Sequence, residues 1–359
     1  MYLDRKWGIR VGKQEANIYE IAKEAGVSIA TVSRVINRSA FVSEKSTQRV
    51  MEAVQKLNYV PNSMARSLST SVSMSIGVVV PDINNPFFSK VLKGVTAVAD
   101  KEGYQVVLYS SDECEAREQK ILHSLREYRL RGIIITPVSE DCKDTLLQLK
   151  DYAARSIPVV LLDREVGDSG FDRVVSLDED GVYRAVLEML HAGHRRIAII
   201  TGPLHSRPGK ERLHGYKRAM EEFGILLNND YIRHGDFRID RAYEEALNLC
   251  TLPEPPTAIF ASNNMTTYGC LKAFGQLGLQ IGKDISLFGF DDIDALNWLN
   301  YNVSVVSRDV FEMGCSAMRL LLKCFEEGTK SKKGHRHILP TELILRGSER
   351  CSAVAEESL

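Results

Sequence analysis

Residues 18–37 read IYEIAKEAGVSIATVSRVIN, and this stretch decides how the rest of the chain is organised. Ile18, Ile21 and Ala25 recur at the spacing of one apolar face of a helix. Gly26 follows that face, and glycine accepts the left-handed backbone that a sharp turn needs. The pattern therefore predicts a short helix that ends in a tight turn.

Ser28 stands where a helix cap belongs, ahead of a second predicted helix over residues 29–36. A second helix that follows such a turn can lie in the major groove of DNA, with its first residues on base edges. Arg34 can reach a guanine edge or a phosphate. The alternative is an ordinary helical hairpin packed in a larger bundle. The candidate DNA-contacting residues of this segment are Ser28, Ile29, Ala30, Thr31, Ser33, Arg34 and Asn37.

The sequence that follows favours DNA binding. The run AGVSIATVSRVIN, continued by FVSEKSTQRVMEAVQKLNYVPNSMARSLST, resembles the DNA-binding headpiece of the lactose repressor family. The resemblance extends over residues 17–348, and the turn, the recognition helix, the third helix, Tyr-x-Pro-Asn and Ala-Arg-Ser-Leu occur in order. It implies a transcriptional regulator, by default a repressor, that binds a pseudo-palindromic operator as a homodimer and answers a small-molecule effector.

A third helix is predicted from Glu44 to Leu57, before Pro61 stops the chain. Residues 62–70 then show one short apolar helix face, too short to be stable alone in water. In the lactose repressor family this segment is a hinge helix that folds on operator DNA, and Leu68 matches the leucine that it wedges between base pairs. A plain linker is the alternative. The candidate DNA-contacting residues of the hinge are Asn62, Ala65, Arg66 and Leu68.

From residue 75 onward, short β-rich runs alternate with helical stretches. SIGVVVP, YQVVLYS, GIIITP and IPVVLLD lack polar alternation, which predicts parallel strands buried on both faces, and a second set of similar plan follows. The predicted fold is α/β: a three-helix headpiece and hinge helix, then a two-lobed core of parallel sheets. The resemblance implies a periplasmic-binding-protein-like core of type I. The predicted divisions are a flexible leader (1–16), the headpiece (17–61), the hinge and linker (62–74), the core (75–348) and a tail (349–359), with a first lobe of 75–176 and 305–334 and a second lobe of 177–304 and 335–348.

Ligands of open α/β sheets lie beyond the carboxyl ends of the strands, which places the effector site in the cleft between the lobes. Several polar and aromatic residues stand just past predicted strand ends. Asp178 and Asp180 both lie near the crossing between the lobes, and the spacing to the following Gly-His pair favours Asp180. The candidate effector-contacting residues are Asn85, Phe87, Phe88, Arg164, Asp180, Arg212, Phe237, Asn263, Asp291 and Arg308.

Arg308 stands where the family usually has a glutamine. A guanidinium matches carboxylate and phosphate groups, so Arg308 raises the alternative of an acidic effector such as a sugar acid or a sugar phosphate. In the other interpretation Arg308 pairs with Asp309, Asp291 or Asp180 and only shapes a site for a neutral sugar. Asn264, Asn300 and Gly282 also depart from the family pattern, so a sugar identity cannot be carried over.

The overall composition agrees with an intracellular DNA-binding protein. Residues 1–72 carry a net charge of +5 and the remainder −6, which suits a head that meets phosphate. The seven cysteines are odd in number and lack a Cys-x-x-Cys pair, which argues against a disulfide framework or a zinc site. No apolar run is long enough for a membrane span, and MYLDRKWGIRVGKQ has no signal-peptide core. We therefore expect a cytoplasmic protein without membrane contact, metal or cofactor.

The sequence bears on three other classes of protein. An enzyme is disfavoured because no Gly-x-Ser-x-Gly elbow, Walker loop or metal signature occurs, and Gly193 interrupts the pair His191 and His194. A solute-binding protein is disfavoured by the N-terminal helix-turn-helix. A regulator that responds to a partner protein instead of a small molecule remains an alternative. The tail ERCSAVAEESL lacks leucine heptads, so we expect a dimer without a tetramerising coil.

Overall fold

The computed structural model divides the chain into two units, residues 1–73 and residues 74–359. The structure describes residues 16–37, 40–59, 74–327 and 334–350. Four predicted DNA-contacting residues lie outside the described residues, and their assignments stay predictions: Asn62, Ala65, Arg66 and Leu68.

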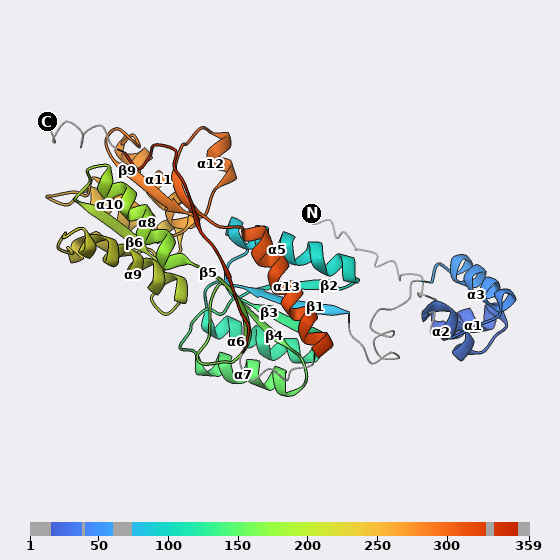
Figure 1. The fold of residues 1–359 in the computed structure, drawn as a ribbon. Helices are drawn as coiled ribbons and strands as arrows, with labels where there is room; N and C mark the ends of the chain where they lie inside the picture. The colour runs from blue at the N-terminus through green and yellow to red at the C-terminus, as the bar shows by residue number, and fades with distance from the viewer. Residues whose placement is uncertain (1–15, 38–39, 60–73, 328–333, 351–359) are drawn as a thin grey trace, which may run out of the picture. The chain divides into compact units, whose positions relative to one another are not determined.

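The described part of the N-terminal unit contains the three predicted helices, α1 (Ile18–Ala25), α2 (Ile29–Asn37) and α3 (Glu44–Lys56) (Figure 1). Asn17 begins α1 with a capping box, because its side chain accepts from the backbone of Glu20 and the Glu20 carboxylate accepts from the backbone of Asn17. Ser28 caps α2 through a 3.1 Å hydrogen bond from the backbone nitrogen of Thr31 to Ser28 Oγ. The local sequence thus sets both helix starts.

The turn and the core of this unit also follow the sequence pattern. Gly26 adopts φ +60°, the left-handed conformation that ends α1. Ile21, Val32 and Val50, one from each helix, are fully buried against one another. This small core holds α2 against α1 and α3 and leaves the opposite side of α2 exposed.

The first lobe of the core is built on a six-stranded sheet of order β11-β5-β4-β3-β1-β2, in which every pair of neighbours is parallel. Its central strands are buried almost throughout, as the unalternated runs predicted. Its strands are β1 (Ser75–Val80), β2 (Gln105–Ser110), β3 (Leu130–Ile135), β4 (Val159–Leu162), β5 (Asp172–Ser176) and β11 (Arg336–Leu339).

The second lobe repeats this plan with a six-stranded sheet of order β12-β10-β9-β8-β6-β7. Its strands are parallel except for β12, which runs antiparallel to β10. Its strands are β6 (Ile197–Thr201), β7 (Ile232–His234), β8 (Ala258–Ala261), β9 (Ser286–Phe290), β10 (Ser304–Ser307) and β12 (Glu342–Ile344).

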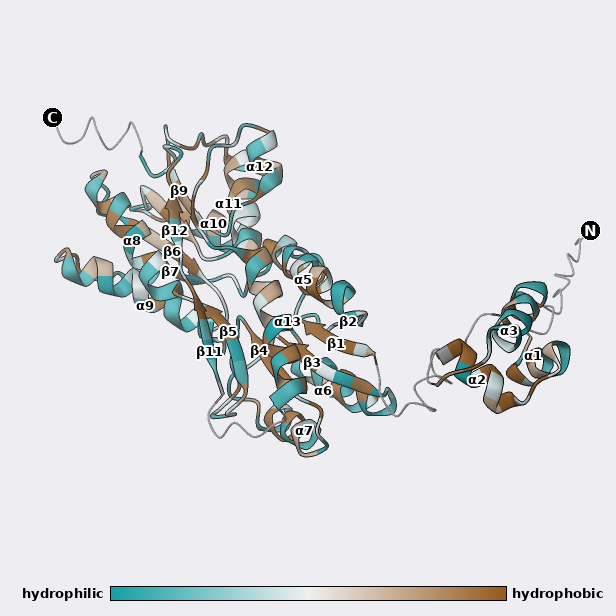
Figure 2. Cartoon of the chain, turned by 45° about the vertical axis from the view of Figure 1, so that its right-hand side comes forward, coloured by the Kyte–Doolittle hydropathy of each residue, from teal (hydrophilic) through white to brown (hydrophobic). Residues whose placement is uncertain are grey.

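Helices cover both faces of each sheet, and Figure 2 shows hydrophobic residues concentrated on the strands between them. On the first sheet, α5 (Pro86–Ala99) and α13 (Val310–Glu327) cover one face, and α6 (Glu115–Ser124) and α7 (Lys143–Ala154) cover the other. On the second sheet, α8 (Asp178–His191) and α9 (Arg207–Glu222) lie opposite α10 (Ile239–Cys250) and α11 (Asn264–Leu277). The short elements are α12 (Asp294–Trp298), η1 (Asp100–Glu102), η2 (Leu125–Glu127) and η3 (Asn229–Tyr231).

The chain passes between the lobes after β5, after β10 and after β11, and Figure 1 shows the last passage as the dark red segment. The predicted lobe boundaries at residues 305 and 335 need correction. Val305 and Val306 pair with Gly289 and Phe290 of the second sheet, and Arg336 pairs with Arg173 of the first. The passages therefore follow Ser307 and Leu339, because long-range pairing decides which sheet a short strand joins.

Two glycines let α5 and α13 approach closely on the first sheet. A Cβ atom on Gly94 would lie 2.1 Å from the carbonyl oxygen of Phe311, and one on Gly314 would lie 2.0 Å from that of Val91. We expect Gly94→Ala to lower the free energy of unfolding by about 1–3 kcal/mol, because the helices must separate. Urea denaturation measures this loss. Gly275→Ala on α11 is the control, since nothing lies within 4 Å of its added Cβ; an equal effect of both changes would contradict the close approach.

Candidate functional site

A cleft lies at the carboxyl ends of the strands, between the two lobes. Nine of the ten predicted effector-contacting residues line it together, and Asp180 does not. The lining residues are Asn85, Phe87, Phe88, Glu113, Asp163, Arg164, Pro208, Arg212, Phe237, Asn263, Asp291 and Arg308.

Two asparagines reach the cleft because they cap helices that follow strands. Asn85 Oδ1 accepts a hydrogen bond from the backbone of Phe87 at the start of α5, at 2.9 Å. Asn263 Oδ1 accepts one from the backbone of Thr266 at the start of α11, at 2.8 Å. Asn264 Nδ2 donates to Asn85 Oδ1 at 2.8 Å, so an amide contact joins the two lobes at the edge of the cleft.

Four lining residues adopt the left-handed backbone region although none is glycine. Glu113, Asp163, Phe237 and Asp291, which follow β2, β4, β7 and β9, have φ angles of +51°, +63°, +56° and +68°. Such conformations cost about 1–3 kcal/mol each and gather at ligand sites, where they aim side chains. Their occurrence at four strand ends that face one cleft makes this cleft the candidate functional site of the core.

Arg308 is buried at the centre of the cleft and is fully engaged by acidic groups. Its Nε donates to Asp291 Oδ1 at 2.8 Å, and its Nη1 donates to Asp163 Oδ1 at 2.6 Å. Burial by itself would lower the pKa of Arg308, but these carboxylates raise the pKa well above its ordinary value. The predicted pairing with Asp291 is therefore present. Asp309 instead accepts from the backbone of Glu312, at 2.8 Å.

Arg212, on α9 of the second lobe, extends this network. Its Nε donates to Asp178 Oδ2 at 2.9 Å, and its guanidinium carbon lies 3.5 Å from the centre of the Phe290 ring. Asp178 is completely buried, which would raise its pKa, but Arg212 and then Arg308 hold the pKa below its ordinary value. The carboxylate is therefore charged and anchors two guanidinium groups.

Arg164 forms the third arginine–carboxylate pair of the cleft. Its Nη1 and Nη2 donate to Glu113 Oε2 and Oε1 at 2.8 and 2.7 Å, a bidentate pair between the ends of β4 and β2. Both side chains are largely buried. Each of the three cleft arginines among the described residues thus has a carboxylate partner within the protein.

Asp180 was predicted in preference to Asp178, and neither of the two lines the cleft. The helix α8 begins at Asp178, whose side chain points into the protein, while Asp180 is half-exposed and pairs with Arg184 at 2.9 Å. Residues two apart on a helix point in different directions, so only one of these carboxylates can face the cleft side. Three further lining residues, Glu113, Asp163 and Pro208, were not predicted from the sequence. Asp163 had a signal, since it directly follows the buried run VVLL.

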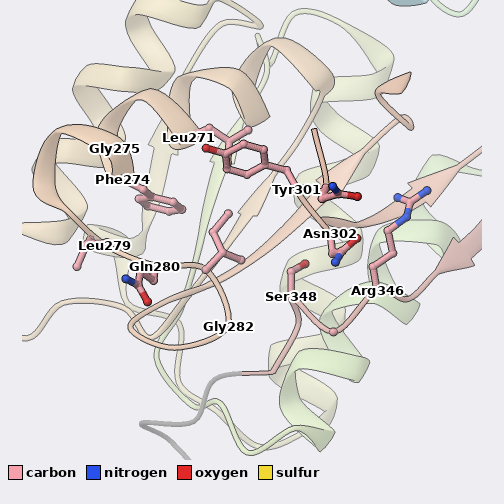
Figure 3. Close-up of a pocket in the computed structure, with 13 residues that line it drawn as sticks. Leu271, Phe274, Gly275, Leu279, Gln280, Gly282, Tyr301, Asn302, Arg346 and Ser348 are labelled. Atoms are coloured by element: carbon pink, nitrogen blue, oxygen red, sulfur yellow. The ribbon is translucent and has the colours of Figure 1, made fainter. Parts of the chain in front are cut away.

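A second pocket of about 500 Å³ lies elsewhere in the second lobe, between the end of α11 and the loops that precede β9 and β10. Figure 3 shows Leu271 and Phe274 on one side of it and Arg346 on the other. Arg346 donates to Asp292 at 2.9 Å and to the carbonyl of Val303 at 2.8 Å, so its charge is already matched. None of the predicted site residues lines this pocket.

The described residues show neither a candidate metal site nor a possible membrane span. They hold no group of three or more His, Cys, Asp and Glu side chains that could bind a metal ion. In the same part of the chain, no helix is both long and apolar enough to cross a bilayer. His194 is buried and bonded through Nδ1 to Thr257 Oγ1 at 2.8 Å, which agrees with its predicted structural role.

The outward side of α2 carries the predicted DNA-contacting residues. Ser28, Ile29, Ala30 and Arg34 are exposed, and Thr31 and Ser33 are half-buried. Ser28 Oγ and Thr31 Oγ1 lie 2.9 Å apart, so the cap also orders the first turn. Asn37 is the last residue of α2, and its side chain lies outside the described part. The helix thus presents small, polar and basic groups on one side, as a major-groove helix does.

Comparison with known proteins decides the family. Residues 17–62 match the family described as bacterial regulatory proteins, lacI family, and residues 186–349 match the periplasmic binding protein-like domain. The ribose operon repressor of Halalkalibacterium halodurans is 35% identical over 329 residues, which cover 92% of this chain and 96% of that protein. This chain belongs to the lacI family.

Two further lacI-family proteins agree with this assignment. The HTH-type transcriptional repressor PurR of Vibrio vulnificus is 33% identical over 331 residues, 92% of this chain and 98% of that protein. The solved structure of the lac repressor dimer bound to operator and the anti-inducer ONPF is 27% identical, with a TM-score of 0.80 over 94% of this chain and 100% of that chain. The protein is thus a DNA-binding transcriptional regulator and not an enzyme.

Proposed function

We propose that this lacI-family regulator is a cytoplasmic homodimer that represses a carbohydrate-utilisation operon from a pseudo-palindromic operator, under the control of a neutral sugar bound in the cleft. The observation that carries the choice of ligand is the pairing of Arg164, Arg212 and Arg308 with carboxylates of the protein. That pairing leaves no described cleft arginine to neutralise an anion.

The charges of the cleft favour a ligand that donates hydrogen bonds. Three carboxylates, those of Glu113, Asp163 and Asp291, line the cleft beside the three arginines, and the buried Asp178 is a further partner of Arg212 and Arg308. The arginines therefore carry no unmatched positive charge. Ionised carboxylates only accept hydrogen bonds, and sugar hydroxyls donate them. An acidic ligand would add a further negative charge to a buried site, which is costly. The charges of the cleft therefore argue against an acidic effector.

The shape of the cleft supports the same class. Phe87, Phe88 and Phe237 supply apolar faces, and such faces suit the C–H side of a sugar ring. The name of the ribose operon repressor agrees with a sugar-linked role.

Isothermal titration of the full-length protein with a panel of ligands tests this proposal. The panel contains neutral pentoses and hexoses, sugar acids, sugar phosphates and nucleobases. We expect a neutral monosaccharide to bind and to change operator affinity, and the operator to change sugar affinity by the same factor, because such coupling is reciprocal. Genome-wide mapping of bound sites supplies the operator. Binding of only acids, phosphates or nucleobases would contradict the proposal.

Arg34 provides the test for operator recognition. It is exposed on α2 beside the small residues of the first turn, where a recognition helix meets base edges. We expect Arg34→Ala to weaken specific operator binding by about 1–3 kcal/mol, with little change on unrelated DNA, if the side chain contacts a base. Fluorescence anisotropy with operator and scrambled duplexes at one salt concentration measures both. An equal loss on the two duplexes would move Arg34 to a phosphate contact.

A further inference from the structure

Arg308 joins the two lobes through a single guanidinium group. It follows β10 of the second sheet and bonds Asp291, which follows β9 of the same sheet. The same group donates from Nη1 to Asp163 Oδ1 at 2.6 Å and to Ser176 Oγ at 2.7 Å, and both partners belong to the first lobe. The Arg308 side chain thus spans the cleft and contacts both lobes.

The surroundings of this guanidinium are those expected for a ligand. Its carbon lies 4.4 Å from the centre of the Phe87 ring and 5.2 Å from that of Phe290. A flat group between aromatic rings, with donors directed at strand-end carboxylates, makes the contacts proposed above for a sugar ring. Arg308 therefore occupies the position on Asp163 and Asp291 that ligand hydroxyls would take.

Two buried contacts between the lobes are hydrogen bonds to neutral acceptors, from Asn264 to Asn85 and from Arg207 to the carbonyl of Ser176. Several charged pairs between the lobes are exposed to water. Lys90 pairs with Asp294 at 3.0 Å, Arg238 with Asp112 at 3.2 Å and Lys210 with Glu140 at 2.8 Å, and each of these cations is at least one-third exposed. Exposed pairs are screened by solvent and salt, whereas the buried Arg308 network is not. Arg308 therefore makes a buried contact between the lobes that is paired to carboxylates of both.

We propose that Arg308 is a tethered occupant of the cleft, which holds the lobes together in the absence of ligand and which an effector must displace from Asp163 and Asp291. The proposal builds on the proposed function, because it adds how that cleft is kept closed before the sugar arrives. It also sets a requirement on the ligand: only a molecule with hydrogen-bond donors can replace a guanidinium on two carboxylates.

The variant Asp163→Asn tests the bridge without leaving Arg308 unpaired. It removes the charged partner in the first lobe and keeps Asp291 on the guanidinium. Hydrogen–deuterium exchange of the full-length protein, without ligand or DNA, reports the opening of the cleft. The informative peptides cover the contacts Asp112–Arg238 and Glu140–Lys210, since no residue of these two pairs bonds Asp163 or Arg308.

We expect Asp163→Asn to raise exchange severalfold in both distant peptides together, because the lobes separate as units. The control Lys90→Ala removes an exposed contact between the lobes and should leave exchange unchanged. A rise confined to the peptides around residues 163 and 308, or no rise, would overturn the proposal. Should Asp163→Asn not fold, Arg308→Lys provides the same test, because one ammonium group cannot span both carboxylates. The readout involves no sugar, so failure of the proposed ligand class leaves it intact.

Discussion

Replacing Arg212 by alanine should lower the free energy of unfolding by about 3–5 kcal/mol, the usual cost of breaking a buried ion pair from one side. Asp178 is fully buried and takes its nearest positive charge from Arg212, at 2.7 Å from Nη2, while Arg308 lies 3.7 Å away. The variant leaves this carboxylate charged in a medium that solvates it poorly. Urea denaturation at neutral pH measures the loss.

Two further variants show whether the buried pair is the cause. Arg218 lies on the same helix and pairs with Glu179 at 3.6 Å, but it is half-exposed, so Arg218→Ala should cost less than about 1 kcal/mol. Adding Asp178→Asn to Arg212→Ala should recover part of the loss, because it removes the orphaned charge. Equal losses from Arg212→Ala and Arg218→Ala would contradict this account.

Glu118→Gln should stabilise the protein by about 3 kcal/mol above pH 7 and have almost no effect below pH 4.5. Glu118 is fully buried behind the Arg164 pair and accepts hydrogen bonds from the backbone of Val138 at 2.8 Å and from Thr145 Oγ1 at 2.7 Å. Loss of hydration raises the pKa of this carboxyl to about 7, although the two hydrogen bonds and then Arg164 oppose the rise.

The direction of the pH dependence follows from this raised pKa. Between about pH 4.5 and pH 7 the folded protein holds a proton on Glu118 that the unfolded chain has released, so stability falls as the pH rises through this window. Glutamine resembles the protonated acid and removes the fall. The difference in melting temperature between variant and wild type, measured from pH 4 to pH 8, isolates Glu118 from other groups. A difference that does not vary with pH would contradict the prediction, and Glu221→Gln at an exposed position of α9 is the control.

The parts of the fold that depend on local sequence were predictable. Asn17, Gly26 and Ser28 set the ends of α1 and α2 through their own backbone contacts, and an apolar run such as β1 can hardly form anything but a buried strand. Most cleft residues were predictable for the same reason, since they directly follow strands. These features need only a short window of sequence.

The remaining features depend on contacts between distant residues. Whether Asp178 or Asp180 faces inward depends on the residue at which α8 starts, and neither Leu177 nor its neighbours form a side-chain cap that marks that start. Glu113 was passed over because its position results from a left-handed backbone after an edge strand. The partner of Arg308 in the first lobe, Asp163, is 145 residues away, and their meeting requires both sheets to be complete.

The three passages between the lobes have a consequence for synthesis on the ribosome. The first lobe begins at β1 but takes its α13 and β11 from beyond residue 309, and Met313, Met318 and Leu321 of α13 fill its core. A nascent chain that ends before residue 309 therefore carries an open apolar face on β1 and α5, because the residues that cover this face have not been synthesised. Domains of most proteins are completed in the order in which they are made. Here the lobe that is begun first cannot be completed until nearly the whole second lobe has left the ribosome, so a premature stop releases no folded half.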